Sequence, residues 1–348
     1  MPIQAEPRPD LSTDRTRAVT ALYSSRDIPA AHIVPAPAAP PRPRLGNGSA
    51  RATAIIGTPY ALGKANPADG MSPVLVPIAV SVAPEWDRRI ARVAGLMDTA
   101  EIDHLIVALP LPSGCYSQIA LGRMIGLNGS VSLLDTEAPP AAGPDASRLS
   151  LMTKDAIDRV CAAFLLTVLS PLMLLVAALI CLTSPGPAFF IQPRLGRHNR
   201  VIPVFKFRTM YEDQSDRLGG CPTVPDDPRV TPLGRVLRRW SIDELPQLLN
   251  VLIGQMSLVG PRPHAVMMKA GEQLYFEALP AYLGRHAVKP GITGWAQVNR
   301  LSGQVDSLAG GRARLACDLH YIRNWSLWLD LKILLMTPTV FFDRVNRY

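Results

Sequence analysis

The run Val160-Cys-Ala-Ala-Phe-Leu-Leu-Thr-Val-Leu-Ser-Pro-Leu-Met-Leu-Leu-Val-Ala-Ala-Leu-Ile-Cys-Leu182 decides the fold class of this chain. Its 23 residues carry no charge, and a helix of that length can cross the hydrocarbon core of a bilayer. A fully buried core helix is the weaker alternative, because so long an uncharged run is unusual in a soluble core.

The flanks of this run predict how it meets the membrane. Ser170 and Pro171 lie near its middle, and a proline removes a hydrogen bond from the helical ladder. Basic residues stand on both sides, and the positive-inside rule therefore places both ends in the cytoplasm. They are Lys154 and Arg159 before the run, and Arg194, Arg197, Arg200, Lys206 and Arg208 after it. The pattern predicts a re-entrant helix over about 155–183 that bends at Ser170-Pro171.

A second stretch, Ser241-Ile-Asp-Glu-Leu-Pro-Gln247, places two carboxylates, Asp243 and Glu244, before a proline and an apolar run. Pro246 predicts a helix start, and the Ser241–Glu244 spacing of a capping box would start it slightly earlier. The positive end of that helix favours the ionised carboxylates. With Arg238 and Arg239 before it and an arginine after it, the stretch suits phosphate chemistry with a divalent cation. A capped helix with surface ion pairs is the open alternative.

Other cations follow the same theme. In Val204–Met210, strand alternation predicts Lys206 and Arg208 on one face and the phenylalanines on the other, unless this is simply a solvated basic strand. A glycine-rich loop at 285–299 offers Arg285 and Gln297 as donors to a phosphate or base. Tyr321–Lys332 predicts a helix in the membrane interface, or one that covers the core.

Length and composition bound the remainder. The 348 residues predict about two domains, and a net charge of +8 suits nucleic acid, anionic lipid or a phosphorylated substrate. The five cysteines show no Cys-x-x-Cys spacing, which predicts neither a disulfide framework nor a zinc site. The N-terminus lacks an apolar signal-peptide core, and residues 1–50 are predicted to be a disordered, Pro/Ala-rich tail.

Residues 51–143 alternate strands and helices, which predicts a small α/β domain with a parallel sheet. The expected strands are 54–56, 74–82, 105–109 and 131–134, and the expected helices are 86–97 and 116–127. Gly57–Gly63 matches a dinucleotide loop poorly, so no nucleotide is expected there. A linker at 144–153 then leads to a membrane-anchored catalytic domain, 154–348.

Four motifs in order make residues 150–348 resemble the bacterial sugar transferases, the monotopic polyprenyl-phosphate hexose-1-phosphate transferases. They are Lys206-Phe-Arg-Thr-Met, Ser241-Ile-Asp-Glu-Leu-Pro-Gln, Gly260-Pro-Arg-Pro-His and Lys289-Pro-Gly-Ile-Thr-Gly-Trp-Ala-Gln-Val-Asn. The resemblance implies an α/β fold: a re-entrant membrane helix broken at Ser170-Pro171 and a catalytic unit on the cytoplasmic face of the bacterial inner membrane. It also suggests that 51–143 is a degenerate Rossmann-like remnant.

The resemblance further implies transfer of hexose-1-phosphate, with glucose or galactose favoured, from a UDP-sugar to undecaprenyl phosphate. UMP is released, Mg²⁺ is used, and the product begins exopolysaccharide synthesis. Asp243 would be the nucleophile and Glu244 the metal ligand. Lys206, Arg238 and Arg262 would bind phosphate.

The sequence departs from the family after Asn299, where Gly-x-Arg-Gly-Glu-Thr is common. Here Arg300 is followed by Leu-Ser-Gly-Gln-Val, so Ser302 and Gln304 replace the family's arginine and glutamate.

A catalytically silent membrane scaffold of a polysaccharide assembly complex is the alternative function. A nucleic-acid binder is disfavoured, because the basic residues are dispersed and no aromatic stacking platform is evident. Homo-oligomerisation is left open.

Overall fold

The computed structural model describes residues 53–57, 61–62, 74–77, 83–99, 102–109, 121–125, 127, 129–135 and 143–345. Short gaps within the last range fall at 218, 220, 222, 225, 267, 271–272, 280, 302 and 304–306. All of the described residues belong to one unit, Ala50–Tyr348. The tail predicted at 1–50, and Ser302 and Gln304, lie outside the described residues.

The predicted strands of the N-terminal region form a four-stranded sheet in the order β2-β1-β3-β4, with every pair parallel. The register places Ile56 between Val76 and Val107. The sheet prediction is therefore confirmed. Gly57 is explained by strand packing, because a Cβ there would lie 2.9 Å from the Cβ of Ala108. The elements are β1 (Thr53–Gly57), β2 (Val74–Pro77), α3 (Ala83–Asp98), β3 (His104–Leu109) and β4 (Ser130–Asp135).

The helix predicted at 86–97 is α3, and of the helix predicted at 116–127 the structure describes helical residues at 121–125. Apolar residues of this sheet, such as Leu105 and Leu133, belong to one buried cluster with Leu274, Leu283 and other residues after position 190. An isolated antiparallel bridge joins Ser132 to Arg200. The sheet and the remainder of the unit thus share apolar core.

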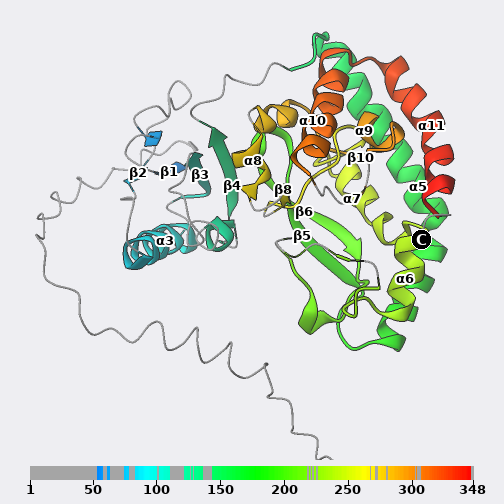
Figure 1. Cartoon of the computed structure of the whole chain (residues 1–348), viewed down its shortest axis with the longest axis horizontal. Coiled ribbons are helices and arrows are strands. Elements are labelled where there is room, and N and C mark those ends of the chain that lie inside the picture. The colour runs from blue at the N-terminus through cyan, green and yellow to red at the C-terminus, as the bar shows by residue number, and fades with distance from the viewer. Residues whose placement is uncertain are drawn as a thin grey trace, which may run out of the picture. The chain divides into compact units, whose positions relative to one another are not determined.

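From Arg148 onward the chain is mostly helical, with three two-stranded pairings (Figure 1). The strands β5 and β6 pair antiparallel, β7 and β10 parallel, and β8 and β9 antiparallel. The strands are β5 (Phe189–Leu195), β6 (Val201–Phe207), β7 (Ser257–Val259), β8 (Lys269–Ala270), β9 (Gln273–Leu274) and β10 (Gly291–Thr293). The α-helices are α5 (Arg148–Thr183), α6 (Pro232–Arg239), α7 (Gln247–Leu252), α8 (Tyr275–Ala278), α9 (Trp295–Val298), α10 (Leu308–Arg323) and α11 (Leu327–Val345). The 3-10 turns are η1 (Arg197–Asn199), η2 (Glu212–Gln214), η3 (Ile242–Glu244) and η4 (Tyr282–Ala287).

Helix α5 contains the uncharged run and is, by length and composition, able to cross a membrane. It begins at Arg148, where the side chain of Ser147 accepts a hydrogen bond from the backbone N–H of Ser150 at 3.1 Å. Six of the ten residues of the predicted linker, 148–153, are therefore helical. Much of its apolar surface is uncovered: Phe164 is 66% exposed and Leu174 71%. An apolar surface of this kind suits contact with lipid.

The helix is continuous across Pro171, so the bend predicted there stays a prediction. Pro171 has no N–H to donate to the carbonyl of Thr167, four residues before it. The hydroxyl of Ser170 donates to that carbonyl instead, at 2.8 Å. The Ser-Pro pair therefore removes a helical hydrogen bond and supplies a side-chain substitute.

Polar contacts join the first turns of α5 to α11, to β7 and to the segment before β10. Lys154 pairs with Asp330 of α11 at 2.6 Å, and Asp155 with Lys289 at 2.7 Å. The hydroxyl of Ser257 in β7 donates to Asp158 at 2.6 Å. Helix α11 lies beside α5, and the two contribute to one apolar cluster (Figure 1).

The region predicted as one interfacial helix, 321–332, contains the end of α10 and the start of α11. Tyr321 and Trp325 are buried, and both donate to Asp330, at 2.7 and 3.2 Å. Trp328 and Leu335 of α11 are 73% and 69% exposed. Both interpretations therefore hold in part: one face covers the core, and the other presents apolar side chains outward.

Candidate active site

The centre of the site is the carboxylate of Glu244, which two cations hold. Arg262 donates from both terminal nitrogens, with Nη1 at 3.0 Å from Oε2 and Nη2 bonded to Oε1. Lys206 donates to Oε1 at 3.1 Å. The three residues come from the loop after β7, from β6 and from η3, so the fold brings together cations that the sequence separates by 56 residues. A bidentate arginine fixes the plane of the carboxylate as well as its position.

The predicted capping box does not form. Ser241 has a left-handed backbone, with φ of 50°, and its side chain makes no cap hydrogen bond. The side chain of Glu244 turns to the two cations instead of back to Ser241. The turn η3 ends at Glu244, and α7 begins only at Gln247 with Pro246 before it. The ion pairs of Glu244 with Lys206 and Arg262 therefore form in place of the predicted capping hydrogen bonds.

Asn250 of α7 holds the strand that carries Lys206. This fully buried side chain accepts from the backbone N–H of Phe205 at 3.0 Å and donates to the carbonyl of Pro203 at 2.6 Å. Both contacts fall on β6 next to Lys206, so α7 fixes this strand. In the sequence, the only sign of this contact with β6 is that Asn250 is a polar residue within the apolar run 248–253.

Arg262 is positioned by Arg285, which is buried and does not itself contact Glu244. Arg285 donates to the carbonyl of Arg262 at 2.7 Å and pairs with Asp318 of α10, whose Oδ2 lies 2.9 Å from Nε. Gly260 is required in the same loop, because a Cβ would lie 2.5 Å from the carbonyl oxygen of Lys289. The sequence predicts that Arg285 binds substrate. In the structure its guanidinium bonds to the carbonyl of Arg262 and to Asp318.

The two carboxylates have opposite electrostatic environments. Burial alone would raise the pKa of Glu244, but Arg262 and Lys206 hold that pKa well below its usual range. Burial and the adjacent Glu244 carboxylate raise the pKa of Asp243 to about 6, against the weaker pull of Lys206, Arg238 and Arg262. The helix start was expected to favour ionisation of both; for Asp243 burial and the like charge outweigh it. Asp243 accepts no hydrogen bond from the described residues, so its carboxylate is available for chemistry.

Sequence reasoning did not single out Arg194 of β5 as a site residue. It is half-buried, donates to Gln192 and to the carbonyl of Pro263, and interacts electrostatically with both carboxylates. Burial, and then the charge of Arg262, lower the pKa of Arg194 to about 10. Burial likewise lowers the pKa of Lys206, with Glu244 opposing. Burial thus destabilises the charged forms of Arg194 and Lys206, and a phosphate group bound beside them would stabilise those charges.

Three other predicted residues lie differently. Arg238 donates to Thr209 at 2.7 Å and Thr223 at 3.2 Å, and its charge reaches Asp243. Arg208 does not share the face of Lys206, because β6 ends at Phe207; its guanidinium bonds to Ser184 and Pro185 at the end of α5.

Gln297 in α9 donates to the carbonyl of Ile292 at 3.2 Å. Its Oε1 is buried without a hydrogen-bond partner among the described residues. The amide therefore keeps an acceptor that a neighbouring donor group could use.

The acidic pair offers oxygen ligands of the kind that magnesium takes. Within the described segments no group of three or more His, Cys, Asp or Glu residues could hold a metal alone. Magnesium commonly keeps several waters and binds through one or two carboxylates plus substrate phosphates. Glu244 supplies such a carboxylate, beside cations that suit the phosphates.

Comparisons with known proteins identify the family of the chain. A family profile described as bacterial sugar transferase matches residues 149–344. An undecaprenyl-phosphate glucose phosphotransferase of Komagataeibacter xylinus is 52% identical over 191 residues, 55% of this chain and 36% of the relative. The exopolysaccharide production protein PSS of Rhizobium leguminosarum bv. phaseoli is 49% identical over 189 residues, 54% of this chain and 94% of the relative.

A UDP-glucose:undecaprenyl-phosphate glucose-1-phosphate transferase of Escherichia coli (strain K12) is 43% identical over 241 residues, 69% of this chain and 49% of the relative. The chain thus spans about a third to a half of the length of two of these relatives. The family profile covers more than half of the chain and includes every residue of the Glu244 cluster. This protein therefore belongs to the bacterial sugar transferase family.

Proposed function

We propose that the protein transfers hexose-1-phosphate from a UDP-sugar to undecaprenyl phosphate, with release of UMP, as the first membrane step of exopolysaccharide synthesis. The observation that carries this is the unequal acid pair. Glu244 is held by Arg262 and Lys206, while Asp243 is nearly buried and accepts no hydrogen bond from the described residues. One carboxylate is fixed among phosphate-binding cations, and its neighbour is available as a nucleophile.

The names of the relatives support the substrates. Three relatives carry undecaprenyl phosphate in their names. The Escherichia coli protein is also named for UDP-glucose, and one from Aeromonas hydrophila for UDP-N-acetylgalactosamine. We favour glucose or galactose for this chain. We further propose that α5 enters and leaves on the cytoplasmic face of the inner membrane, with the bend at Ser170-Pro171.

The reaction would run as two displacements. Lys206, Arg262, Arg194 and Arg238 would hold phosphate oxygens and offset their charge. A carboxylate oxygen of Asp243 attacks the sugar-bearing phosphorus, and the bond from that phosphorus to the UMP oxygen breaks. This leaves an acyl phosphate that carries the sugar. An oxygen of undecaprenyl phosphate then attacks the same phosphorus, and the Asp243 carboxylate leaves as it began.

Magnesium held by Glu244 would neutralise charge on the pyrophosphate. Glu244 can bind a cation because its low pKa keeps it ionised. Direct attack by the lipid phosphate, with Asp243 as a base, is the rival mechanism.

The test uses the full chain, purified in lipid nanodiscs, with UDP-glucose and Mg²⁺ and no polyprenyl lipid. We expect release of UMP in an amount equal to the enzyme, and a phosphosugar adduct on Asp243 by mass spectrometry. Asp243→Asn should abolish both, and Glu244→Gln should weaken the response to Mg²⁺. The matched control is Asp213→Asn, an exposed carboxylate in η2, which should behave as wild type.

Adding undecaprenyl phosphate should then discharge the adduct, and a panel of UDP-glucose, UDP-galactose and UDP-N-acetylgalactosamine identifies the hexose. Turnover with lipid but no adduct without it supports the rival mechanism. A folded protein that releases no UMP under either condition supports the scaffold instead.

A further inference from the structure

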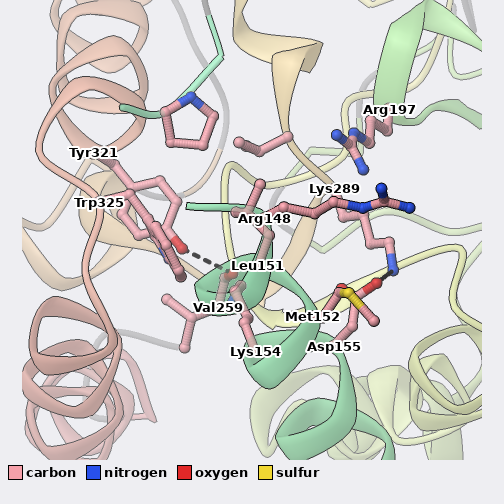
Figure 2. Close-up of a pocket in the computed structure, with 12 residues that line it drawn as sticks. Arg148, Leu151, Met152, Lys154, Asp155, Arg197, Val259, Lys289, Tyr321 and Trp325 are labelled. Atoms are coloured by element: carbon pink, nitrogen blue, oxygen red, sulfur yellow. Dashed lines mark hydrogen bonds and ion pairs between the residues drawn. The ribbon is translucent and has the colours of Figure 1, made fainter. Parts of the chain in front are cut away.

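A cavity of about 290 Å³ lies at the N-terminal end of α5 and shares no lining residue with the Glu244 cluster (Figure 2). Its wall is mixed. Leu151, Val259 and Trp325 supply apolar surface, whereas Arg148 and Arg197 are among four cations that line it. In Figure 2 the guanidinium groups of Arg148 and Arg197 lie on one side of the cavity, and the aromatic side chains lie on the other. A wall of this composition suits an anionic group attached to an apolar one.

Of the four cations in the wall, the two lysines form ion pairs with carboxylates, and among the described residues the two arginines do not. Lys154 pairs with Asp330 at 2.6 Å, and Lys289 pairs with Asp155 at 2.7 Å. Arg148 and Arg197 have no ion pair or side-chain hydrogen bond within the parts of the chain that the structure describes. The cavity therefore has two guanidinium groups whose donors are directed to no protein acceptor there.

Arg197 is presented by a strained turn. The next two residues, His198 and Asn199, both have φ of 57°, the left-handed region that side chains other than glycine seldom adopt. The side chain of Asn199 is bonded to the buried His286 at 2.6 Å. Such strain persists where surrounding contacts impose it and concentrates at binding sites.

The first turns of α5, which contribute to the cavity wall, also carry exposed apolar side chains. Leu149 and Met152, in the first turns of α5, are 74% and 61% exposed. Met152 also lines the cavity. These side chains continue toward the uncovered apolar surface of α5, so a ligand in the cavity can extend an acyl chain along the helix. Guanidinium groups bind phosphate through paired hydrogen bonds.

We propose that this cavity binds the phosphodiester headgroup of an anionic phospholipid, with Arg148 and Arg197 as the phosphate donors. The site is separate from the reacting lipid and anchors the first turn of α5 at the headgroup level. The proposal rests on the membrane insertion of α5 and not on the transfer reaction.

The experiment is native mass spectrometry of the full chain, released from detergent that contains equal amounts of phosphatidylglycerol and phosphatidylcholine. Wild type should retain phosphatidylglycerol in preference. Arg148→Gln with Arg197→Gln should lower the retained fraction roughly tenfold, because each arginine contributes charge-assisted hydrogen bonds. The matched control is Arg235→Gln with Arg312→Gln, two exposed arginines outside the cavity that remove the same charge. Circular dichroism establishes that both double variants fold, and Arg148→Lys with Arg197→Lys should retain an intermediate fraction.

An equal loss in both glutamine variants would overturn the proposal, because net charge alone would then explain retention. Equal retention of the two lipids in wild type would also overturn it. Displacement by undecaprenyl phosphate at equal concentration would reassign the cavity to the acceptor, and displacement by inorganic phosphate alone would show that the lipid chains contribute nothing. UMP release is measured on the same variants, so failure of the transfer reaction stays distinguishable.

Discussion

At the scale of single residues, the reactivity of Asp243 depends on its protonation. Burial and the Glu244 carboxylate raise its pKa to about 6. A raised pKa means that the protonated, unreactive acid persists to a higher pH than for an ordinary aspartate. UMP release without lipid should therefore fall as the pH drops below about 6 and should be nearly constant above pH 7. The measurement is the rate of single-turnover UMP release between pH 5 and pH 8.

Glu244→Gln provides the control for this prediction. It removes the neighbouring negative charge and keeps the shape, so the midpoint of the residual rate should move to lower pH. A midpoint that is unchanged in this variant would show that the observed titration belongs to another group.

Arg285 gives a second prediction at this scale, because it acts through Arg262. Arg285→Lys keeps the charge but cannot bridge Asp318 and the carbonyl of Arg262 at once. We expect kcat to fall about 10- to 100-fold, as for loss of a charged hydrogen bond, with a smaller change in KM. Combined with Arg262→Lys, its effect should be less than additive. Additive losses, or a thermal unfolding midpoint that falls in proportion, would point to a structural role only.

The sequence located the acid pair, Lys206 and Arg262, because motif order is a local property of the chain. It could not assign Arg285 or Arg194, since the same guanidinium can bind a ligand, a carboxylate or a backbone carbonyl. Which of these it binds depends on contacts such as Asp318, 33 residues away. The capping-box prediction was wrong for a related reason. The side chain of Glu244 bonds to Lys206 and Arg262, which the tertiary fold brings close, and not to the backbone of Ser241.

At the scale of elements, the proposal of a re-entrant α5 depends on the Ser170-Pro171 pair. The side-chain hydrogen bond from Ser170 to Thr167 satisfies the carbonyl that Pro171 leaves without its N–H. Replacing both residues with leucine restores the backbone hydrogen bond and removes a penalty of about 3 kcal/mol for proline in a helix interior. The segment should then favour a full span.

The measurement is labelling of cysteines placed at Met152 and Phe190 in a cysteine-free background. In the natural sequence both should react from the cytoplasmic side, and in the Leu-Leu variant the two should react from opposite sides. Ser170→Ala alone is the control that keeps the proline. Opposite labelling in the natural sequence would contradict the re-entrant helix.

Apolar runs with clear limits, such as β1, β3 and the core of α5, could be predicted because their periodicity is read along the chain. The boundary of α5 could not, because the cap at Ser147 and the contacts of Lys154 and Asp155 extend the helix before the uncharged run. The break between α10 and α11 was also missed. It depends on Asp330 drawing together Tyr321 and Trp325, which are separate in sequence.

At the scale of the whole molecule, the N-terminal sheet supplies apolar core but none of the Glu244 cluster. A chain that starts at Pro144 should keep single-turnover chemistry, since Lys206, Asp243, Glu244 and Arg262 all remain. Its thermal unfolding midpoint should be lower, because removal of the sheet exposes apolar partners in the shared cluster. Removal of 1–49 alone is the control and should leave the midpoint unchanged. Loss of UMP release in a folded, membrane-inserted chain from Pro144 would contradict the prediction.

The contacts that fasten α5 have a consequence for distance from the membrane. A straight helix of 36 residues is about 54 Å long, well beyond the roughly 30 Å of hydrocarbon in a bilayer. Its first turns are bonded to α11, β7 and Lys289, so they cannot slide independently of the catalytic region. The depth to which the uncharged run sinks therefore sets the height of Asp243 above the bilayer surface. Transfer to a lipid acceptor should then vary with acyl-chain length in defined nanodiscs, whereas lipid-free UMP release should not.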